Sequence, residues 1–346
     1  MDFFLNSEYI DHDRWIELVS LGVVAGDGRE FYAISTEFDP AGGNDFVHGV
    51  VLPQLEPVGH PAWMSRTAMK EALLRFVGDD SPRFWSYGSA PWDWLAMVQL
   101  MPLAERVPDG WTYTAYDVTC LLELAGSVGD PALPGPPSNQ HHALADARWT
   151  RDVYRWLAGR SDRTRPSGLV DYVVDAEFID GDLEVDLVSL AVVAYDGREF
   201  YAVSNEFDPS RANDFVATTV LPQLEAPGDQ VWMSRQEIKD GLLAFVGNST
   251  PRFWSWGGLP YDWMVIAQLF GVDERMPDGW LYTGYDITLL VNRAGFSIDP
   301  LDLRLPQHTG AAHHALADAH WAQDVLRAIQ RMPGVATDRG ETERRP

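Results

Sequence analysis

Cysteine and long apolar runs are nearly missing from this chain, and each shortage excludes a class of protein. Cys120 is the only cysteine among 346 residues, so neither an internal disulfide nor a cysteine-rich zinc site can form. A single cysteine also fits a reducing compartment. No apolar run reaches the roughly 18 residues that a membrane helix needs, and the first residues lack the basic segment of a secretory signal. We therefore expect a cytoplasmic protein with no membrane partner.

Basic residues are scarce as well. The chain has 26 Lys and Arg against 51 Asp and Glu, which gives a net charge of −25. This balance excludes a protein that wraps a nucleic-acid duplex through a broad basic face. It leaves open a small acidic site that holds metal ions and meets a phosphate through them. With 46% hydrophobic residues the chain can bury a proper core, and its length allows two domains.

The two lysines of the chain, Lys70 and Lys239, reveal an internal repeat. They lie 169 positions apart, and segments 18–21, 27–33, 63–66 and 108–111 recur at the same offset as 187–190, 196–202, 232–235 and 277–280. The offset grows to 172 at His141 and His313, so the second repeat has a longer loop. A repeat of this length indicates two whole domains of one fold. We predict domains at 1–160 and 171–331, a linker at 161–170 and a flexible tail at 332–346. Because 11 basic and 22 acidic residues lie in 1–160, and 15 and 29 in 161–346, the halves carry −11 and −14.

Each repeat predicts the same order of elements. Three strands come first, at 3–9, 16–25 and 30–38, and in the second repeat at 172–178, 185–194 and 199–207. A helix at 66–77 or 235–246, a buried strand at 84–87 or 253–256, and a helix opened by Pro91 or Pro260 follow. Helices at 117–125 and 141–157, or 286–294 and 313–329, complete the repeat. This order predicts an α/β fold, with a mixed sheet flanked by helices, in two tandem copies.

Four carboxylates of the second repeat fall where one site could gather them. Asp175 and Glu177 are two apart on a predicted strand and so point to one face. Asp262 lies in the first turn of a predicted helix, and Asp318 follows His313 by five residues at the start of the last one. Gathered carboxylates repel one another, and hard divalent cations such as Mg²⁺ or Mn²⁺ relieve this. Two ions, about 3.5–4 Å apart, would clamp the attacking and leaving oxygens of a phosphodiester. A neutral histidine could take a proton from water.

Taken singly, these residues have ordinary interpretations. A strand Asp-x-Glu is common at surfaces, and an Asp at a helix start commonly caps the helix. Histidines beside a helix start are often solvated. The combination, in this order and in these contexts, is far more specific than any of its parts.

The series Asp175-x-Glu177, Asp262 and His313-x4-Asp318 resembles the DEDD superfamily of 3′–5′ exonucleases, in its histidine-containing branch. Segments 175–179, 196–204, 206–209, 220–222, 234–236 and 313–319 are similar to the actinobacterial ribonuclease AS group within it. The resemblance covers nearly the whole of each repeat. It implies a ribonuclease H-like fold, two Mg²⁺ or Mn²⁺ ions per active site, and hydrolysis of single-stranded, adenylate-rich RNA from the 3′ end.

The resemblance also implies roles for particular residues. The metal ligands would be Asp175, Glu177, Asp262 and Asp318, with Asp175 bridging both ions. His313 would be the general base, with its neighbour His314 as the alternative. Phe178 lies where the family grips the terminal nucleotide, and Trp256, like Trp232 and Trp254, could stack on bases. Core packing is the competing interpretation for these aromatic residues.

The first repeat departs from the pattern at one position. Its matching residues are Asn6, Glu8, Asp93, His141 and Asp146. Asn6 is neutral where the second repeat has Asp175, which weakens the attraction for divalent ions. We predict that this half is catalytically weak or inactive and serves as a scaffold or RNA-holding partner; a deliberate Asp-to-Asn replacement would leave the same sequence.

Three further hypotheses remain open at this point. The same chemistry could act on DNA ends, because recognition of the 2′-OH cannot be read from the residues. Both halves could also have lost activity, leaving a non-catalytic RNA-binding protein. Finally, the repeat suggests an intrachain pseudo-dimer.

Overall fold

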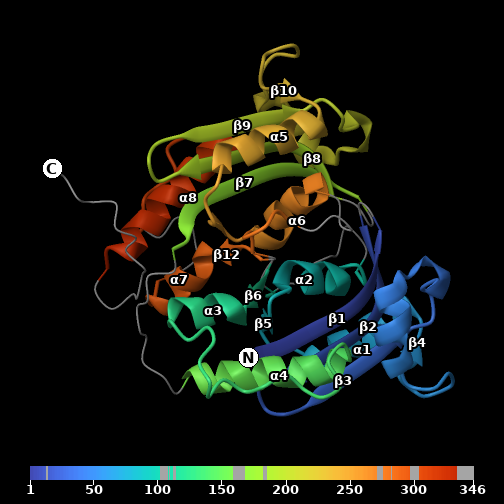
Figure 1. Ribbon diagram of the computed structural model, residues 1–346. Coiled ribbons are helices and arrows are strands. Elements are labelled where there is room, and N and C mark those ends of the chain that lie inside the picture. Colours follow the sequence, from blue (N-terminus) through green and yellow to red (C-terminus); the bar gives the residue numbers. More distant parts are fainter. Residues whose placement is uncertain are drawn as a thin grey trace. The chain divides into compact units, whose positions relative to one another are not determined.

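The computed structural model describes residues 1–12, 15–101, 108, 110–111, 114–158, 168–181, 185–270, 276–281, 283–296 and 304–332. The chain divides into two compact units (Figure 1). The first unit contains Met1–Glu123 and Ser127–Ser161, and the second contains Leu124–Gly126 and Asp162–Pro346. Most of the predicted linker and nearly all of the predicted tail fall outside the described residues. The exact domain boundaries therefore stay predictions.

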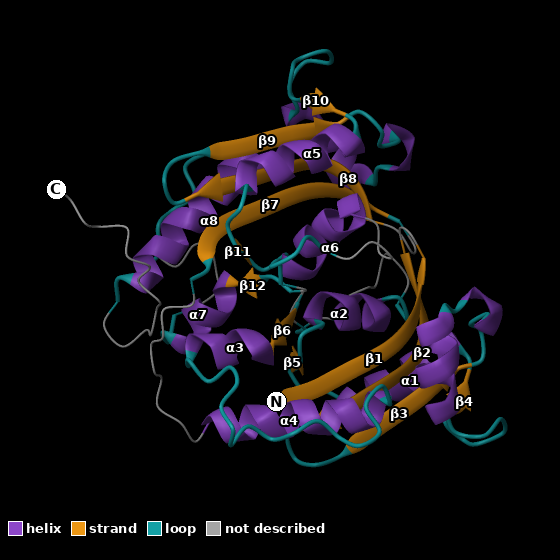
Figure 2. Cartoon of the chain, viewed as in Figure 1, coloured by secondary structure: helices purple, strands orange, loops and turns teal. Residues whose placement is uncertain are grey.

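The second unit is built on a six-stranded mixed sheet (Figure 2). The sheet order is β10-β9-β8-β7-β11-β12. The first three strands in the chain pair antiparallel, and β10, β11 and β12 each join in parallel. The strands are β7 (Val170–Asp180), β8 (Val185–Ala194), β9 (Glu199–Ser204), β10 (Trp232–Met233), β11 (Pro251–Ser255) and β12 (Tyr285–Asp286).

The first unit has a sheet of the same kind. Its order, β4-β3-β2-β1-β5-β6, repeats that of the second sheet strand for strand. Together the two sheets confirm the predicted α/β fold class, a mixed sheet flanked by helices. The strands are β1 (Asp2–His12), β2 (Trp15–Ala25), β3 (Glu30–Ser35), β4 (Trp63–Met64), β5 (Arg83–Ser86) and β6 (Ala115–Asp117).

Capping residues fix where the helices begin and end. In α5, Ser234 and Glu237 form a reciprocal capping box, and Gly247 ends the helix with a φ of 62°. The predicted helices at 66–77 and 235–246 match the structure residue for residue. The described helices are α1 (Arg66–Val77), α2 (Ala90–Val98), α3 (Val118–Leu124), α4 (Ala143–Ala158), α5 (Arg235–Val246), α6 (Leu259–Phe270), α7 (Ile287–Arg293) and α8 (Ala315–Gln330).

The last helix of each unit packs directly on the sheet. In the second unit, Ala315 and Ala319 of α8 pack against Ala191 and Val193 of β8. In the first unit the approach leaves no room for a side chain, because a Cβ on Gly22 would lie 2.4 Å from the backbone carbon of Ala143. The start of the last helix is therefore fixed against the middle of the sheet.

Two expectations about local structure were wrong. The last helix was expected to begin at His141 and His313, but α4 begins at Ala143 and α8 at Ala315. Both histidines instead have positive φ, 68° and 66°, which is incompatible with a helical turn. His313 therefore lies in the loop before α8, whereas Asp318 lies in its first turn. The π-helices Val47–Val51 and Val216–Val220 were not expected at all.

Candidate active site

The centre of β7 supplies the first two carboxylates of the candidate site. Asp175 and Glu177 pair with Ala191 and Ser189 of β8, and the register shifts just beyond Glu177. Both carboxylates are half-buried on one face of the sheet. The pKa of the Glu177 carboxyl rises to about 8, because burial and then the charges of Asp318 and Asp262 oppose its ionisation. The same causes, burial first, raise the pKa of Asp175 well above its ordinary value.

The third carboxylate, Asp262, is buried at the start of α6 with 3% of its surface exposed. Its Oδ1 accepts a hydrogen bond of 3.0 Å from the backbone N–H of Ala176, and its Oδ2 accepts one from the hydroxyl of Ser255. Burial raises its pKa to about 7, although these hydrogen bonds oppose the rise. Each oxygen keeps a second lone pair for a further partner.

Asp318, in the first turn of α8, holds the loop that precedes it. Its Oδ2 accepts a hydrogen bond of 2.8 Å from the backbone N–H of His313. Its Oδ1 lies 2.5 Å from Nε2 of His308. This contact places a second histidine at the site.

These residues form a cluster that suits a cation. One ligand atom from each of Glu177, His313 and Asp318 lies within 4.8 Å of the others. Burial first, and then the charges of neighbouring carboxylates, raise the pKa values of Asp175, Glu177 and Asp262. A divalent cation would replace the protons and remove this repulsion. The donor set, carboxylate oxygens with one imidazole, fits hard divalent ions.

Residues 213–223 hold the His313 loop from the other side. The side-chain N–H groups of Gln223 donate to the backbone oxygens of Thr219 and Ala312, both at 2.8 Å, and to that of His313 at 3.3 Å. The ring of Phe215 meets the His313 ring edge-on, with centroids 4.8 Å apart. The loop is therefore tied to the body of the unit.

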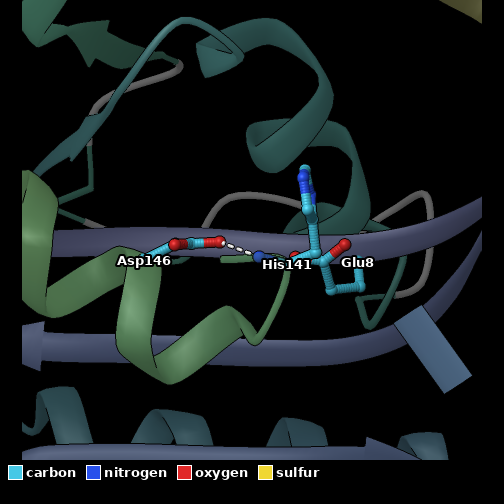
Figure 3. A group of neighbouring side chains, drawn as sticks. All are labelled: Glu8, His141 and Asp146. Atoms are coloured by element: carbon cyan, nitrogen blue, oxygen red, sulfur yellow. Dashed lines mark hydrogen bonds between the residues drawn. The ribbon is translucent and has the colours of Figure 1, made fainter. Parts of the chain in front are cut away.

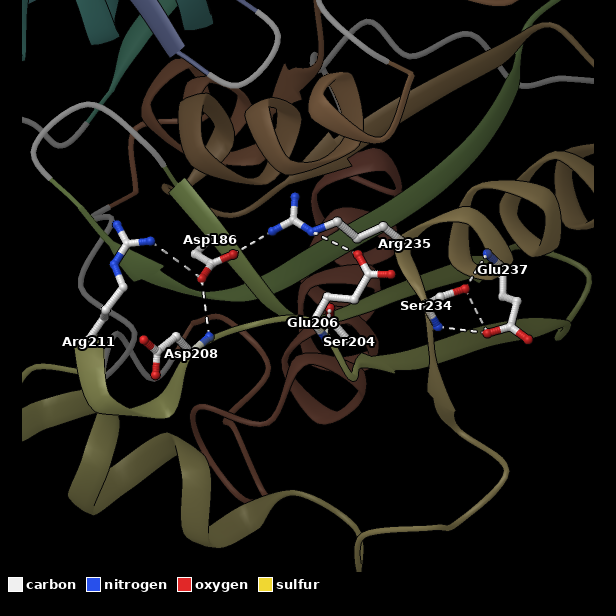
Figure 4. A network of polar contacts seen from close by, with 8 residues as sticks. All are labelled: Asp186, Ser204, Glu206, Asp208, Arg211, Ser234, Arg235 and Glu237. Atoms are coloured by element: carbon white, nitrogen blue, oxygen red, sulfur yellow. Dashed lines mark hydrogen bonds and ion pairs between the residues drawn. The ribbon is translucent and has the colours of Figure 1, made fainter.

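The arginines that lie near the start of β8 are already paired with carboxylates. Asp186 lies opposite Ile179, two residues beyond Glu177. Its buried carboxylate meets Arg235 at 2.5 Å and Arg211 at 3.9 Å, as Figure 4 shows. Arg235 also lies 3.8 Å from Glu206. These positive charges are balanced locally, so they add little net attraction for a polyanion.

The corresponding site of the first unit keeps the same framework (Figure 3). Ligand atoms of Glu8, His141 and Asp146 again lie within 4.8 Å of one another. The backbone N–H of His141 donates to Asp146 at 2.7 Å. Burial, with the charges of Asp146 and Asp93, raises the pKa of Glu8 to about 9. Oδ1 of Asn6 is buried and has no hydrogen-bond partner among the described residues.

The aromatic candidates have different surroundings. Phe178 is half-buried and stacks on Tyr261, with ring centroids 5.1 Å apart and an interplanar angle of 13°. Trp256 meets Trp321 edge-on at 4.8 Å. Trp254 is only 1% exposed, so it belongs to the core.

Sequence reasoning missed His308, Ser255 and Gln223. The last two have matching residues in the first repeat, Ser86 and Gln54, which also bond to Asp93 and to the loop before His141. The repeat itself was therefore a usable signal for them. His308 had none, because the residue 172 positions earlier is Pro136.

Comparison with known proteins identifies a family and relatives that this chain resembles. Residues 170–330 match the family of the 3′–5′ exoribonuclease Rv2179c-like domain. The chain is 38% identical over 169 residues to the 3′–5′ exoribonuclease Rv2179c of Mycobacterium tuberculosis strain H37Rv, covering 48% of this chain and 98% of that protein. It is equally similar to the 3′–5′ exoribonuclease MT2234.1 of strain CDC 1551.

Solved structures of exonuclease I are more distant. That of Methylocaldum szegediense has a TM-score of 0.36 and 14% identity, and covers 56% of this chain and 54% of its own. A zinc-bound Escherichia coli form with single-stranded DNA has a TM-score of 0.37 and 10% identity, with the same coverage. The present chain thus spans about half the length of these structures.

The fold, the clustered carboxylates and the family match define a hydrolase of the 3′–5′ exoribonuclease class, as the sequence predicted. The chain belongs to the Rv2179c-like 3′–5′ exoribonuclease family. Among the helices that the structure describes, none has both the length and the apolar character to traverse a bilayer.

Proposed function

We propose that the second unit hydrolyses single-stranded, adenylate-rich RNA from its 3′ end by a two-metal mechanism, as in the ribonuclease AS group. The observation that supports this most is the convergence of Glu177, His313 and Asp318 within 4.8 Å of one another, beside two more acids of raised pKa. The family match over 170–330 falls on this unit.

Each residue has a proposed role. Asp175, Glu177, Asp262 and Asp318 would hold two Mg²⁺ or Mn²⁺ ions, and bound ions would polarise the scissile phosphate and favour deprotonation of the attacking water. His313 accepts the proton of that water. Asp318 orients His313 through its backbone N–H, and Ser255 orients Asp262.

The first unit, in this proposal, is catalytically weak because Asn6 replaces the bridging acid. We further propose that the two repeats associate as an intrachain pseudo-dimer. A scattering profile of two separate, freely moving lobes would contradict that association.

One assay tests the central proposal. The full chain is incubated with 5′-labelled poly(A), the other RNA homopolymers and single-stranded DNA, with Mg²⁺, Mn²⁺ or EDTA, alongside Asp175→Ala. We expect stepwise 3′ shortening that requires metal and Asp175, and is fastest on poly(A). Full activity in EDTA would refute the two-metal mechanism, and equal rates on DNA would refute RNA specificity. No hydrolysis by the wild-type chain would favour a non-catalytic RNA-binding protein.

A further inference from the structure

We propose that Phe215 stacks on a base of the bound RNA, near the 3′ end. This inference rests on the proposed function of the second unit. It assigns a substrate-binding role to a residue that the sequence did not single out.

Phe215 is exposed where an aromatic ring is expected to be covered. Among the residues that the structure describes, Phe46 and Phe215 are the only exposed aromatic side chains, at 48% and 50%. Leaving such a ring in water forgoes the stabilisation that its burial would bring. An exposed ring held in the same place in both repeats therefore has the features of a binding surface.

The ring stands on a rigid base. Its neighbours Val216 and Val220 are 6% and 1% exposed and pack into a cluster with Ile179 and Val188. The side chain of Asn213 accepts a hydrogen bond of 2.9 Å from the backbone N–H of Val216. Phe215 is thus the outward residue of an anchored turn, and holding a base there costs little ordering of the protein.

The ring also stands at the rim of the site. Its centroid lies 4.8 Å from that of His313, whose ligand atom lies within 4.8 Å of Glu177 and Asp318. The two rings are nearly perpendicular, at 88°, so His313 covers at most one face of Phe215. A nucleotide whose phosphate meets the carboxylates therefore lies beside the His313 ring that Phe215 contacts, and its base can extend toward Phe215.

The negative charge of the second half favours base stacking over direct charge attraction as the way to hold the RNA. The second half carries −14, and the arginines at Asp186 are already paired with carboxylates. A base can stack on an aromatic ring without any positive charge, and every base offers a face for it. Stacking on Phe215 would supplement the contact that bound cations make with the phosphate.

The test compares Phe215→Ala and Phe215→Trp with the matched control Phe46→Ala in the full chain. The substrates are 5′-labelled oligo(A) and the same oligonucleotide with an abasic residue at the last or the penultimate position. We expect Phe215→Ala to raise KM on oligo(A) between about five- and 150-fold with a smaller change in kcat. We expect the KM of Phe215→Trp and that of Phe46→Ala to stay within about twofold of the wild-type value. On one of the abasic substrates, the KM of Phe215→Ala should be about equal to that of the wild type.

Two results would overturn the inference. A loss in Phe215→Ala that is the same on oligo(A) and on both abasic substrates would show that Phe215 only supports the His313 ring. Unchanged KM in Phe215→Ala, with an active wild type, would remove Phe215 from the substrate site and leave the proposed function intact. A wild-type chain that shortens no RNA would instead refute the proposed function, and this inference with it.

Discussion

The two units have the same arrangement of site residues, but the acidic side chains at matching positions accept different numbers of hydrogen bonds. In the second unit Asp262 accepts two hydrogen bonds from described residues, whereas Asp93 in the first unit accepts four. The extra donors are hydroxyls of Ser7 and Ser89, where the second repeat has Ala176 and Gly258. Those hydroxyls stabilise the ionised Asp93, whose pKa rises only to about 6.

On our proposal, these differences lower the affinity of the first unit for metal ions. Asn6 removes one charge, and the serines satisfy a remaining acid that a cation would otherwise neutralise. On our proposal, the first unit keeps the shape of the site but attracts divalent cations less, because it has one carboxylate fewer. The following predictions test this difference, beginning with the largest expected effect.

Asp175→Asn should reduce kcat on poly(A) by at least about 1000-fold, because loss of this proposed metal ligand would remove several kcal/mol of transition-state stabilisation. Asn6→Ala, the matched change in the first unit, should leave kcat within about twofold. Both are measured by 5′-labelled RNA shortening, with circular dichroism melting to confirm folding.

The reciprocal change sharpens the same comparison. Asn6→Asp in the Asp175→Asn background should restore slow, metal-dependent shortening, because it returns the missing carboxylate. If Asn6→Ala abolished activity while Asp175→Asn did not, the assignment of the active unit would be reversed.

His313→Ala should lower kcat by about 100- to 10,000-fold, the usual contribution of a general base, with little change in KM. His141→Ala serves as its control and should have no effect on turnover. A similar loss in His314→Ala, with His313→Ala still active, would move the role of base to the neighbouring histidine.

Gln223→Ala should lower kcat by about 5- to 30-fold, because it removes hydrogen bonds worth about 1–2 kcal/mol that tie down the His313 loop. Gln54→Ala is the control in the first unit. An unchanged kcat for Gln223→Ala would show that the loop keeps its position without this side chain.

The smallest effect concerns stability. The pKa values of Glu177, about 8, and Glu8, about 9, exceed the ordinary 4.5. The folded state therefore holds these protons more tightly than the unfolded state, and the resulting stabilisation, complete below pH 4.5, is lost as pH rises through 8 and 9. The Tm of the metal-free protein should therefore fall between about pH 5 and 9.

Two neutral variants separate the units in this experiment. Glu177→Gln and Glu8→Gln should each flatten the decline in Tm, since a carboxamide does not ionise. At about pH 8, Mg²⁺ should raise the Tm of Glu8→Gln as in the wild type and that of Glu177→Gln much less. A metal-free Tm that rises over this range would contradict the raised pKa values.

The sequence predicted the long elements well because their patterns are strong. The largely apolar strand β8 and the serine-capped helix α5 were placed residue for residue. β10 and β12 have only two residues each, too few to show any periodicity. They form because neighbouring strands offer them hydrogen bonds, which is tertiary information.

The site was predictable in membership more than in geometry. Asp-x-Glu spacing on a strand placed Asp175 and Glu177 correctly on one face. The last helix was expected to begin at His313, yet His313 lies in a turn, where its backbone N–H donates a hydrogen bond to the carboxylate of Asp318. His308 reaches Asp318 from ten residues away, through a loop whose path no local pattern gives.

The positive φ of His313 determines at which stage the free-energy cost of ordering its loop arises. A non-glycine residue in the left-handed region has a narrow energy well and is held there by its surroundings at about 1–3 kcal/mol. That cost is met once, as the chain folds, so the imidazole does not have to be found again among many loop conformations at each turnover. His141 has the same unfavourable backbone conformation, in a unit that on our proposal is catalytically weak. Folding stability could therefore improve through substitutions at His141, whereas at His313 such substitutions would remove the base.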